Sequence, residues 1–293
     1  GARQAIRTQL IEQRLLREGD TYALYDLQTY LGNLVAMADR CRRPERLSQL
    51  ADLLLPAFGS LENLGPPDEH HQGWVCRGGS LCTVQNRRLG REVTLVSLQG
   101  LGLFTDLAAR LADQPDRRLQ HHPFVNRTAG VAQSHLQRLS TPVLLASLLH
   151  RIHASPVQAN SSSELLFDSK DIWLYTIALN TSLISPRSWR PTESVGAMVQ
   201  AVALLFLQRT NLDRNTKLLR ASLDEGFWSH YPDSAYSAYE GSLSPVVCLD
   251  VAGRLEPVPR KPPIPPQSAA NVGWDISHSR RLVSLFEAVN RYQ

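Results

Sequence analysis

The sequence contains few lysines and lacks long apolar runs. Lys170, Lys217 and Lys261 are the only lysines among 31 basic residues, so arginine carries almost all of the positive charge. The arginines are scattered and the net charge is only +4, which argues against a nucleic-acid-binding protein. No stretch approaches the roughly 20 apolar residues that cross a bilayer. We therefore expect a soluble globular protein with neither nucleic acid nor a membrane span.

The arginine bias has two interpretations. It is typical of the codon usage of a GC-rich genome, which carries no functional meaning. It is also what a protein needs if guanidinium groups bind the carboxylates or sulfates of an anionic ligand, since they do this better than ammonium groups.

Recognised motifs for nucleotides, metals and nucleophilic catalysis are missing as well. The chain has no P-loop, no Rossmann glycine pattern, no nucleophile elbow and no His-Glu-x-x-His motif. Two histidine pairs, His70-His71 and His121-His122, consist of adjacent residues whose side chains point in different directions. We predict no metal and no cofactor.

Cysteine is scarce, and two of the four cysteines lie close together. Cys76 and Cys82 enclose the five residues Arg-Gly-Gly-Ser-Leu, a loop short enough for a local disulfide. Two free thiols are an equal alternative, and a metal site is less in keeping with the spacing. A disulfide would favour a secreted or periplasmic location, which the sequence otherwise leaves unknown.

Apolar residues recur at helical spacing along most of the chain. The first helix ends at Gly19, the second is capped by Asp20, and the third begins at Pro44. Gly100 and Gly102 interrupt the fourth, either for close helix packing or to leave space for a ligand. The predicted helices cover residues 3–18, 20–35, 44–54, 92–111, 125–139, 142–153, 168–184, 192–209 and 213–223.

The residue pattern of the C-terminal part differs from the helical spacing of the preceding segments. Only Pro245–Val258 has the β-branched, turn-bounded pattern of a short hairpin, whereas residues 59–90 have a loop-like composition. Residues 256–271 are predicted to form a Pro-rich, polyproline-like strap. Residues 272–293 are predicted to form a final helix, whose buried face comprises Leu282, Val283, Phe286 and Val289. Because no composition break divides the chain, we predict one helical domain over residues 1–293.

These elements predict an all-α fold, an α/α-toroid-like array of about ten helices with one short hairpin and the strap. Three segments resemble α/α-toroid carbohydrate-active enzymes, which include polysaccharide lyases and glycoside hydrolases: Gly90–Gln99, Asp168–Tyr175 and Gly273–Arg281. The resemblance covers the architecture of most of the chain and implies activity on a polysaccharide, anionic or neutral, without specifying a single family.

Four loop-to-helix clusters place aromatic residues beside Asp, Glu, His or Arg. Such a mixture suits a sugar, because its apolar face stacks on a ring while its hydroxyls bond polar side chains. The predicted substrate-binding residues are Trp74, Arg77, His122, Asn126, Arg127, Trp228, His230, Trp274 and Arg280.

The same clusters supply candidate catalytic groups. A lyase acting on a uronate needs a group that neutralises the carboxylate, a base and an acid. Asn126 and Arg127 could do the first, and Tyr231, Tyr236 or a histidine the others. A hydrolase needs two facing carboxylates, for which Asp275 with Glu240 or Asp233 is the first choice. Asp275 also lies one helical turn from His278 and could orient its imidazole.

We therefore expect a polysaccharide-active enzyme that cleaves an acidic glycan, with elimination favoured over hydrolysis. The alternative is a non-enzymatic helical scaffold that binds a protein partner, since arginine and tyrosine are enriched at interface hot spots.

Overall fold

The computed structural model describes residues 1–65, 71–154, 168–184, 190–213, 220–223, 238–239, 247–249, 255–257, 267–268 and 276–292. Side chains are described for residues 1–65, 71–154, 168–184, 190–210 and 281–292. By its internal contacts the chain divides into two compact units. Unit 1 comprises Gly1–Leu148, Asp168–Ala203 and Arg280–Gln293, and unit 2 comprises Leu149–Phe167 and Leu204–Ser279. Each is considered by itself.

The described residues are mostly helical, as predicted. The first half of the chain forms α1 (Ala2–Ala5), the π-helical η1 (Ile6–Glu18), α2 (Ala23–Arg40), α3 (Pro44–Leu54), the short 3₁₀ helix η2 (Leu55–Ser60), β1 (Leu61–Asn63), β2 (Gln72–Trp74), α4 (Thr94–Ala112), α5 (Arg117–Gln120), α6 (Pro123–Leu139) and α7 (Pro142–His153). The second half forms α9 (Ser169–Ile184), α10 (Glu193–Arg209), β3 (Thr210–Asp213), β4 (Arg220–Leu223), β5 (Ala238–Tyr239), β6 (Val247–Leu249), β7 (Leu255–Pro257), β8 (Gln267–Ser268) and α11 (Ile276–Tyr292).

The predicted helix end at Gly19 and the predicted helix start at Pro44 are confirmed, whereas α2 spans Ala23–Arg40 and its N-cap residue is Tyr22 rather than Asp20. Gly19 ends η1 in the left-handed conformation, with φ of 69°, which glycine adopts without a steric penalty. Asp20 follows, and its carboxylate accepts a hydrogen bond from the backbone N–H of Tyr22 ahead of α2. Pro44 occupies the first turn of α3, where its missing N–H is not needed.

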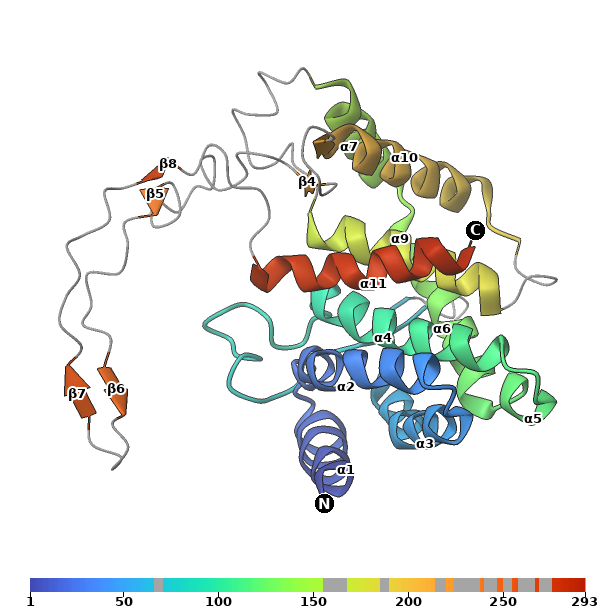
Figure 1. Cartoon of the computed structure of the whole chain (residues 1–293), viewed down its shortest axis with the longest axis vertical. Helices are drawn as coiled ribbons and strands as arrows, with labels where there is room; N and C mark the ends of the chain where they lie inside the picture. Colours follow the sequence, from blue (N-terminus) through green and yellow to red (C-terminus); the bar gives the residue numbers. More distant parts are fainter. Residues whose placement is uncertain are drawn as a thin grey trace. The chain divides into compact units, whose positions relative to one another are not determined.

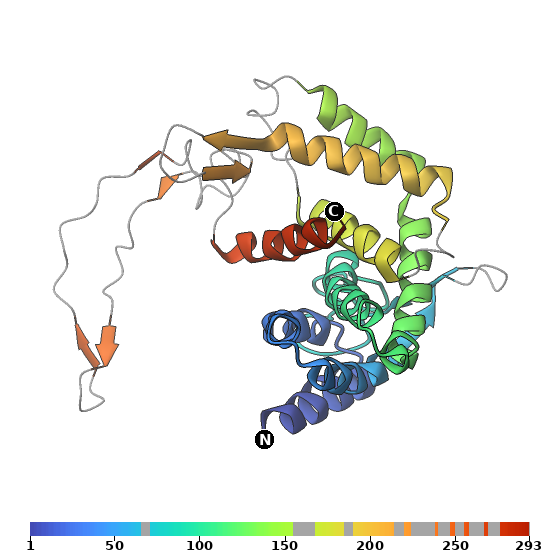
Figure 2. The ribbon, with the colours of Figure 1, turned by 45° about the vertical axis from the view of Figure 1, so that its right-hand side comes forward.

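Helix α4 lies at the centre of unit 1, with α2, α3, α6, α9 and α11 around it (Figures 1 and 2). Every residue from Val96 to Leu111 is buried, so α4 has no solvent-facing side. A Cβ on Gly100 would lie 2.9 Å from Leu24 Cβ of α2, and one on Gly102 would overlap the ring of Trp173 of α9. The two glycines therefore allow close helix packing, which is one of the two roles predicted for them.

The strands correct two predictions. Residues 213–223, predicted as a helix, contribute to the antiparallel pair β3–β4, in which Thr210 pairs with Leu223 and Asp213 with Arg220. The leucine spacing there is helical, but the segment also contains Asp213, Asn215 and Thr216, which are poor helix formers. A second pair, β1–β2, lies in the segment predicted as loop, so Pro245–Val258 does not hold the only hairpin.

Within unit 2 the predicted C-terminal hairpin is confirmed. Strand β6 pairs with β7 in antiparallel register, with Cys248 opposite Glu256. Gln267 and Ser268 of the predicted Pro-rich strap form β8, which pairs with β5. The rest of the strap, residues 258–266 and 269–271, lies outside the described residues.

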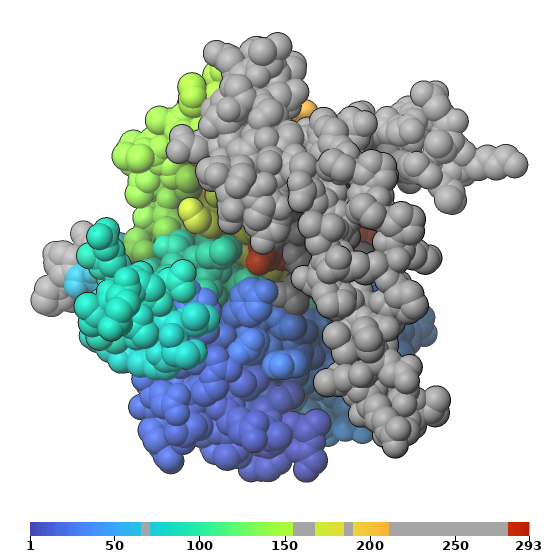
Figure 3. All heavy atoms as spheres, turned by 90° about the vertical axis from the view of Figure 1, so that its left-hand side faces the viewer, coloured from blue at the N-terminus to red at the C-terminus, as the bar shows by residue number. Residues whose placement is uncertain are grey.

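Cys76 and Cys82 form a disulfide, which resolves the alternatives left open by the sequence. The bridged loop packs on the turn between η1 and α2, where the backbone N–H of Arg77 donates to the carbonyl of Gly19. Figure 3 shows this part of the chain, in teal, as a surface lobe beside the blue N-terminal helices. Both sulfur-bearing residues are buried, although Leu81 between them is exposed. The disulfide thus fixes an exposed loop to the core.

Replacing both cysteines, as Cys76→Ser with Cys82→Ser, should lower the free energy of unfolding by about 2 kcal/mol, because the bridge restricts a short loop in the unfolded chain. Urea denaturation of the wild type with and without a thiol reductant measures this loss. The reductant should leave the double variant unchanged, and Cys41→Ser, at an exposed free thiol, should unfold like the wild type. Equal midpoints for the wild type and the double variant would show that the bridge contributes nothing.

A buried ionic cluster joins the segment after the disulfide loop to α6. Glu92 accepts hydrogen bonds from His135 Nε2, at 3.1 Å, and from Arg138. His135 Nδ1 lies 2.9 Å from the carbonyl oxygen of Val131, so both ring nitrogens face oxygen atoms. Burial alone would raise the pKa of Glu92, but His135 and Arg138 outweigh it and hold that pKa below the ordinary value.

Among the described helices, none is both long and apolar enough to cross a membrane.

Candidate functional site: a polar groove between α2, α4 and α11

Three helices of unit 1 enclose a polar groove of about 150 Å³. Its polar lining combines amide, hydroxyl and carboxylate groups, contributed by Gln28, Thr29, Asn33, Asp106, Ser284 and Glu287. Gly32 of α2 and Gly102 of α4 also line it, and the missing side chain of Gly32 leaves room between the helices. Polar side chains from three helices therefore converge on one groove.

Beside the groove, a buried arginine holds the three helices together. Arg110 of α4 is 3% exposed, and its Nε donates to both carboxylate oxygens of Asp106 at 3.2 Å. Its other nitrogens donate to Asp39 of α2 and, at 2.5 Å, to Glu287 of α11. Burial alone would lower the pKa of Arg110, but the three carboxylates raise it above its ordinary value. Arg110 therefore stays charged and neutralises groups from three helices.

Two further arginines complete this ion network. Arg291 of α11 donates to Asp106 and, at 2.9 Å, to Asn180 of α9. Arg40 of α2 donates to Glu287 at 2.6 Å. Each carboxylate of the network is thus paired with at least one guanidinium group. The network fixes α11, and with it Ser284 and Glu287, against the groove.

The network also explains why the predicted buried face of α11 is wrong. Val283 and Phe286, predicted to be buried, are 52% and 48% exposed, whereas Arg281, Leu285 and Ala288 are buried. Hydrophobic periodicity located the apolar stripe, but α11 docks through Leu285 and Ala288 together with polar contacts. Arg281 donates to Ser169 of α9, and Glu287 and Arg291 join the ion network. The docked face is therefore rotated relative to the apolar stripe.

A second polar pair orients the groove side chain of Gln28. The amide nitrogen of Gln99, which is fully buried on α4, donates to Gln28 Oε1 at 3.2 Å. The nitrogen of Gln28 is then directed to Gly32, where a Cβ added to the glycine would lie 3.3 Å from it. Gln28 consequently offers N–H donors at the groove, while Asp106 and Glu287 offer oxygen acceptors.

The groove is suited to a ligand that both donates and accepts hydrogen bonds. Hydroxyl groups do both, so a polyol or a sugar matches amides and carboxylates on opposite walls. An anion is disfavoured, because the two charged residues that line the groove are acidic and the guanidinium groups are occupied by them. Among the described residues, no group of three or more His, Cys, Asp or Glu side chains is placed to hold a metal ion.

Most of the site residues predicted from the sequence lie outside the described part of the chain. This holds for Trp228, His230, Tyr231, Tyr236, Glu240, Trp274 and Asp275, and for Asp233 of the hydrolase alternative. His278 and Arg280 belong to α11, but their side chains are not among those described.

Two predicted substrate-binding residues lie near the disulfide: Trp74 just before the bridged loop and Arg77 within it. Trp74 is fully buried in an aromatic core cluster, and its indole N–H donates to the carbonyl of Ala57 at 3.1 Å. A ring without exposed surface cannot stack on a sugar, so Trp74 contributes to the core rather than to a sugar site. Arg77 is exposed and forms an ion pair with Glu62, whose pKa it lowers through a hydrogen bond.

The other three lie at the start of α6. His122 caps the helix, since its Nδ1 accepts from the backbone N–H of Phe124 at 3.2 Å. Asn126 and Arg127 are exposed, and the guanidinium of Arg127 lies 6.0 Å from the ring centre of Phe58. Neither these three nor Trp74 and Arg77 line the groove between α2, α4 and α11.

The groove residues were missed because they belong to segments that read as ordinary core helices. A signal was nevertheless present. Asp106 and Arg110 stand four residues apart within a continuous apolar helix, and Glu287 and Arg291 have the same spacing in the last helix. Charged residues are rarely buried unless they are paired, so two such pairs on helices with apolar neighbours indicate a shared polar site.

Compared with known proteins, the chain matches no family model, no curated protein and no solved structure. Its function has to be inferred from its own residues.

Proposed function

We propose that this protein is a polysaccharide-active enzyme and that the groove between α2, α4 and α11 holds one uncharged sugar residue of its substrate. The observation that carries the proposal is the lining of the groove, where amide donors, hydroxyls and carboxylate acceptors converge from three helices. The ion network around Arg110 supports it further, because it holds these groups in place before a ligand arrives. Such preorganisation lowers the entropic cost of binding.

Elimination on an acidic glycan remains the proposed reaction, with hydrolysis as its rival. A hydrolase needs a carboxyl group that carries a proton. Asp106 and Glu287 both accept hydrogen bonds from Arg110, so both act as hydrogen-bond acceptors beside the groove. These two residues therefore fit sugar binding better than proton donation. The catalytic roles stay with Asp275, His278, Tyr231, Tyr236 and Glu240, which we predict from the sequence alone.

Two general features of the molecule, its helix content and its disulfide, are compatible with this proposal. The predominance of helices supports the α/α-toroid architecture that the sequence predicts. The disulfide between Cys76 and Cys82 supports a secreted or periplasmic location, since such bonds persist in oxidising compartments. Extracellular glycans would be accessible there.

Incubation of the protein with a panel of uronate-containing polymers tests the proposed reaction. Elimination should produce absorbance at the unsaturated-uronate band together with new reducing ends. New reducing ends without that absorbance would show that the reaction is hydrolysis rather than elimination. If no glycan of a broad panel gives either signal, the proposal that the protein is an enzyme is contradicted.

Gly32→Leu tests whether the groove binds the glycan. The new side chain would enter the groove, since a Cβ at Gly32 meets only the flexible end of Gln28, and leucine favours a helix over glycine by about 1 kcal/mol. We expect unchanged or higher thermal stability and at least a roughly tenfold loss of glycan affinity in calorimetric titrations.

Gly130→Leu on α6 is the matched control, because a Cβ there meets nothing within 4 Å and the residue is exposed. It should keep wild-type affinity. If the wild type and a folded Gly32→Leu variant bind the glycan with equal affinity, the groove is not the glycan-binding site.

A non-enzymatic, partner-binding protein is the second candidate function. It is favoured by a different observation, an apolar groove elsewhere in unit 1.

A further inference from the structure

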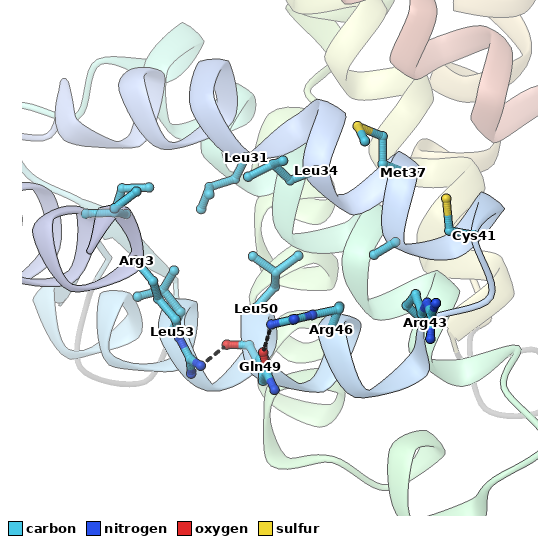
Figure 4. A pocket seen from close by; sticks show the side chains of 13 residues that line it. Arg3, Leu31, Leu34, Met37, Cys41, Arg43, Arg46, Gln49, Leu50 and Leu53 are labelled. Atoms are coloured by element: carbon cyan, nitrogen blue, oxygen red, sulfur yellow. Dashed lines mark hydrogen bonds between the residues drawn. The ribbon is translucent and has the colours of Figure 1, made fainter.

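A larger groove, of about 450 Å³, lies between the first three helices of unit 1 (Figure 4). Leu31, Leu34 and Met37 of α2 form one wall, and Leu50 and Leu53 of α3 form the other. Ile6 at the start of η1 closes one end. This groove is separate from the polar one, and the two share no lining residue.

The apolar surface continues beyond the groove along α2. Tyr30, Leu34 and Met37 are 59%, 46% and 58% exposed and follow one another at four- and three-residue spacing. They form a ridge on the lip of the groove. A continuous exposed apolar surface of this kind marks an interaction site more often than a chance exposure. Methionine and leucine also adapt readily to the side chains of a partner.

Arginines occupy the polar rim of this groove. Arg3 donates to the carbonyl of Gln49 at 3.2 Å, and Arg46 donates to the side chain of Gln49 at 3.0 Å (Figure 4). Arg43 lies at the far end, next to Cys41. Within the described part of the chain, none of the three forms an ion pair and no Asp or Glu lines the groove. The rim therefore carries uncompensated positive charge around an apolar floor.

We propose that this groove binds an amphipathic helix of an acidic partner protein. Apolar side chains of the helix at positions i, i+3, i+4 and i+7 would fill the groove and cover the ridge, while flanking Asp or Glu residues would face Arg3, Arg43 and Arg46. From Leu31 to Cys41 the wall formed by α2 is about 15 Å long, which corresponds to roughly three helical turns of a partner.

Two other occupants fit less well. A single alkyl chain with an anionic head could fill the groove but would leave Tyr30, Leu34 and Met37 of the ridge exposed. A second copy of this chain in a symmetric dimer would bring like surfaces together and place the rim arginines of both copies in one interface. An acidic helix satisfies both the apolar ridge and the charged rim.

A fluorescein-labelled helical peptide of about 16 residues, with leucine on one face and glutamate beside it, probes the site by fluorescence anisotropy. Binding should weaken at least about tenfold on Met37→Lys and on the double change Arg43→Glu with Arg46→Glu. These residues are at the surface, so the variants should fold, which circular dichroism and thermal melting check. Val84→Lys and Arg91→Glu, at exposed positions away from the groove, serve as matched controls.

A charge swap makes the test sharper. The same peptide with lysine in place of glutamate should bind the wild type poorly and gain affinity for the Arg43→Glu, Arg46→Glu variant. The proposal is overturned if the glutamate peptide does not bind, if the groove variants bind it like the wild type, or if the lysine peptide binds the wild type equally well. It is also overturned if only a fluorescent fatty acid binds there, or if sedimentation shows a dimer that Met37→Lys dissociates.

Glycan binding and cleavage should be unaffected by these variants, because the polar groove shares no residue with the apolar one. The docking proposal and the proposed enzymatic function can therefore fail independently.

Discussion

Arg110→Met should lower the free energy of unfolding by about 3–5 kcal/mol, the range found when one partner of a buried ion pair is removed. Methionine fills similar space but leaves Asp39, Asp106 and Glu287 without their shared counter-charge. Asp106 is itself buried, so its charge cannot be solvated without opening the helix packing. Denaturation in urea, followed by circular dichroism, measures the loss.

Arg118→Met is the matched control. Arg118 forms a geometrically similar pair with Asp116, but its side chain is 91% exposed. Exposed ion pairs contribute little, so this variant should remain within about 1 kcal/mol of the wild type. If Arg110→Met were no more destabilising than Arg118→Met, the ion network would not be what holds α2, α4 and α11 together, and the groove would lose its rigid support.

Glu92→Gln is the second variant for which we expect a large effect, a loss of about 3 kcal/mol near neutral pH. The amide cannot neutralise Arg138, and its N–H₂ group would face the donors that now bind the carboxylate. The loss should depend on pH. The pKa of Glu92 is lowered in the folded state, so the ionised carboxylate stabilises the fold at pH values above the ordinary glutamate pKa.

That stabilisation is lost as the pH falls below the ordinary value, 4.5, and through the lowered pKa of the folded state. The stability curves of the wild type and Glu92→Gln should therefore converge in acid and separate toward neutral pH. Glu62→Gln is the control, since the pKa of Glu62 is also lowered but its pair with Arg77 is largely exposed. It should change stability by less than about 1 kcal/mol. Parallel curves for the wild type and Glu92→Gln would contradict a buried ionised Glu92.

Local signals predicted the helical part of the fold well. Gly19 ends one helix and Pro44 begins another, and both effects depend only on the backbone of the residue itself. The close packing at Gly100 and Gly102 was also foreseeable, because a buried helix tolerates glycine where a neighbour needs its space. Residues 213–223 show the limit of this approach. Their leucine spacing is helical, yet β3 and β4 pair across six intervening residues.

The candidate site was much harder to predict, for a physical reason. Glu287 contributes to it through Arg110, which is 177 positions away in the sequence, and hydrophobic periodicity contains no information on such a partner. The apolar stripe of α11 therefore indicated the wrong buried face. The clusters predicted from sequence point to a sugar on chemical grounds, but apart from Trp74, Arg77 and the residues at the start of α6, the side chains of the predicted site residues lie outside the described ones.

Nuclear magnetic resonance of the side-chain amides tests the central claim most directly. Gln28 and Asn33 line the polar groove, and their side-chain N–H₂ signals can be assigned by comparing the wild type with Gln28→Glu and Asn33→Asp. Titration with an oligosaccharide of the glycan that the protein cleaves or binds should shift both signals along one saturable curve. The Gly32→Leu variant should show no such shift. Saturable binding that leaves both amides unperturbed, or no saturable binding by any glycan of the panel, would contradict the assignment of this groove as a sugar site.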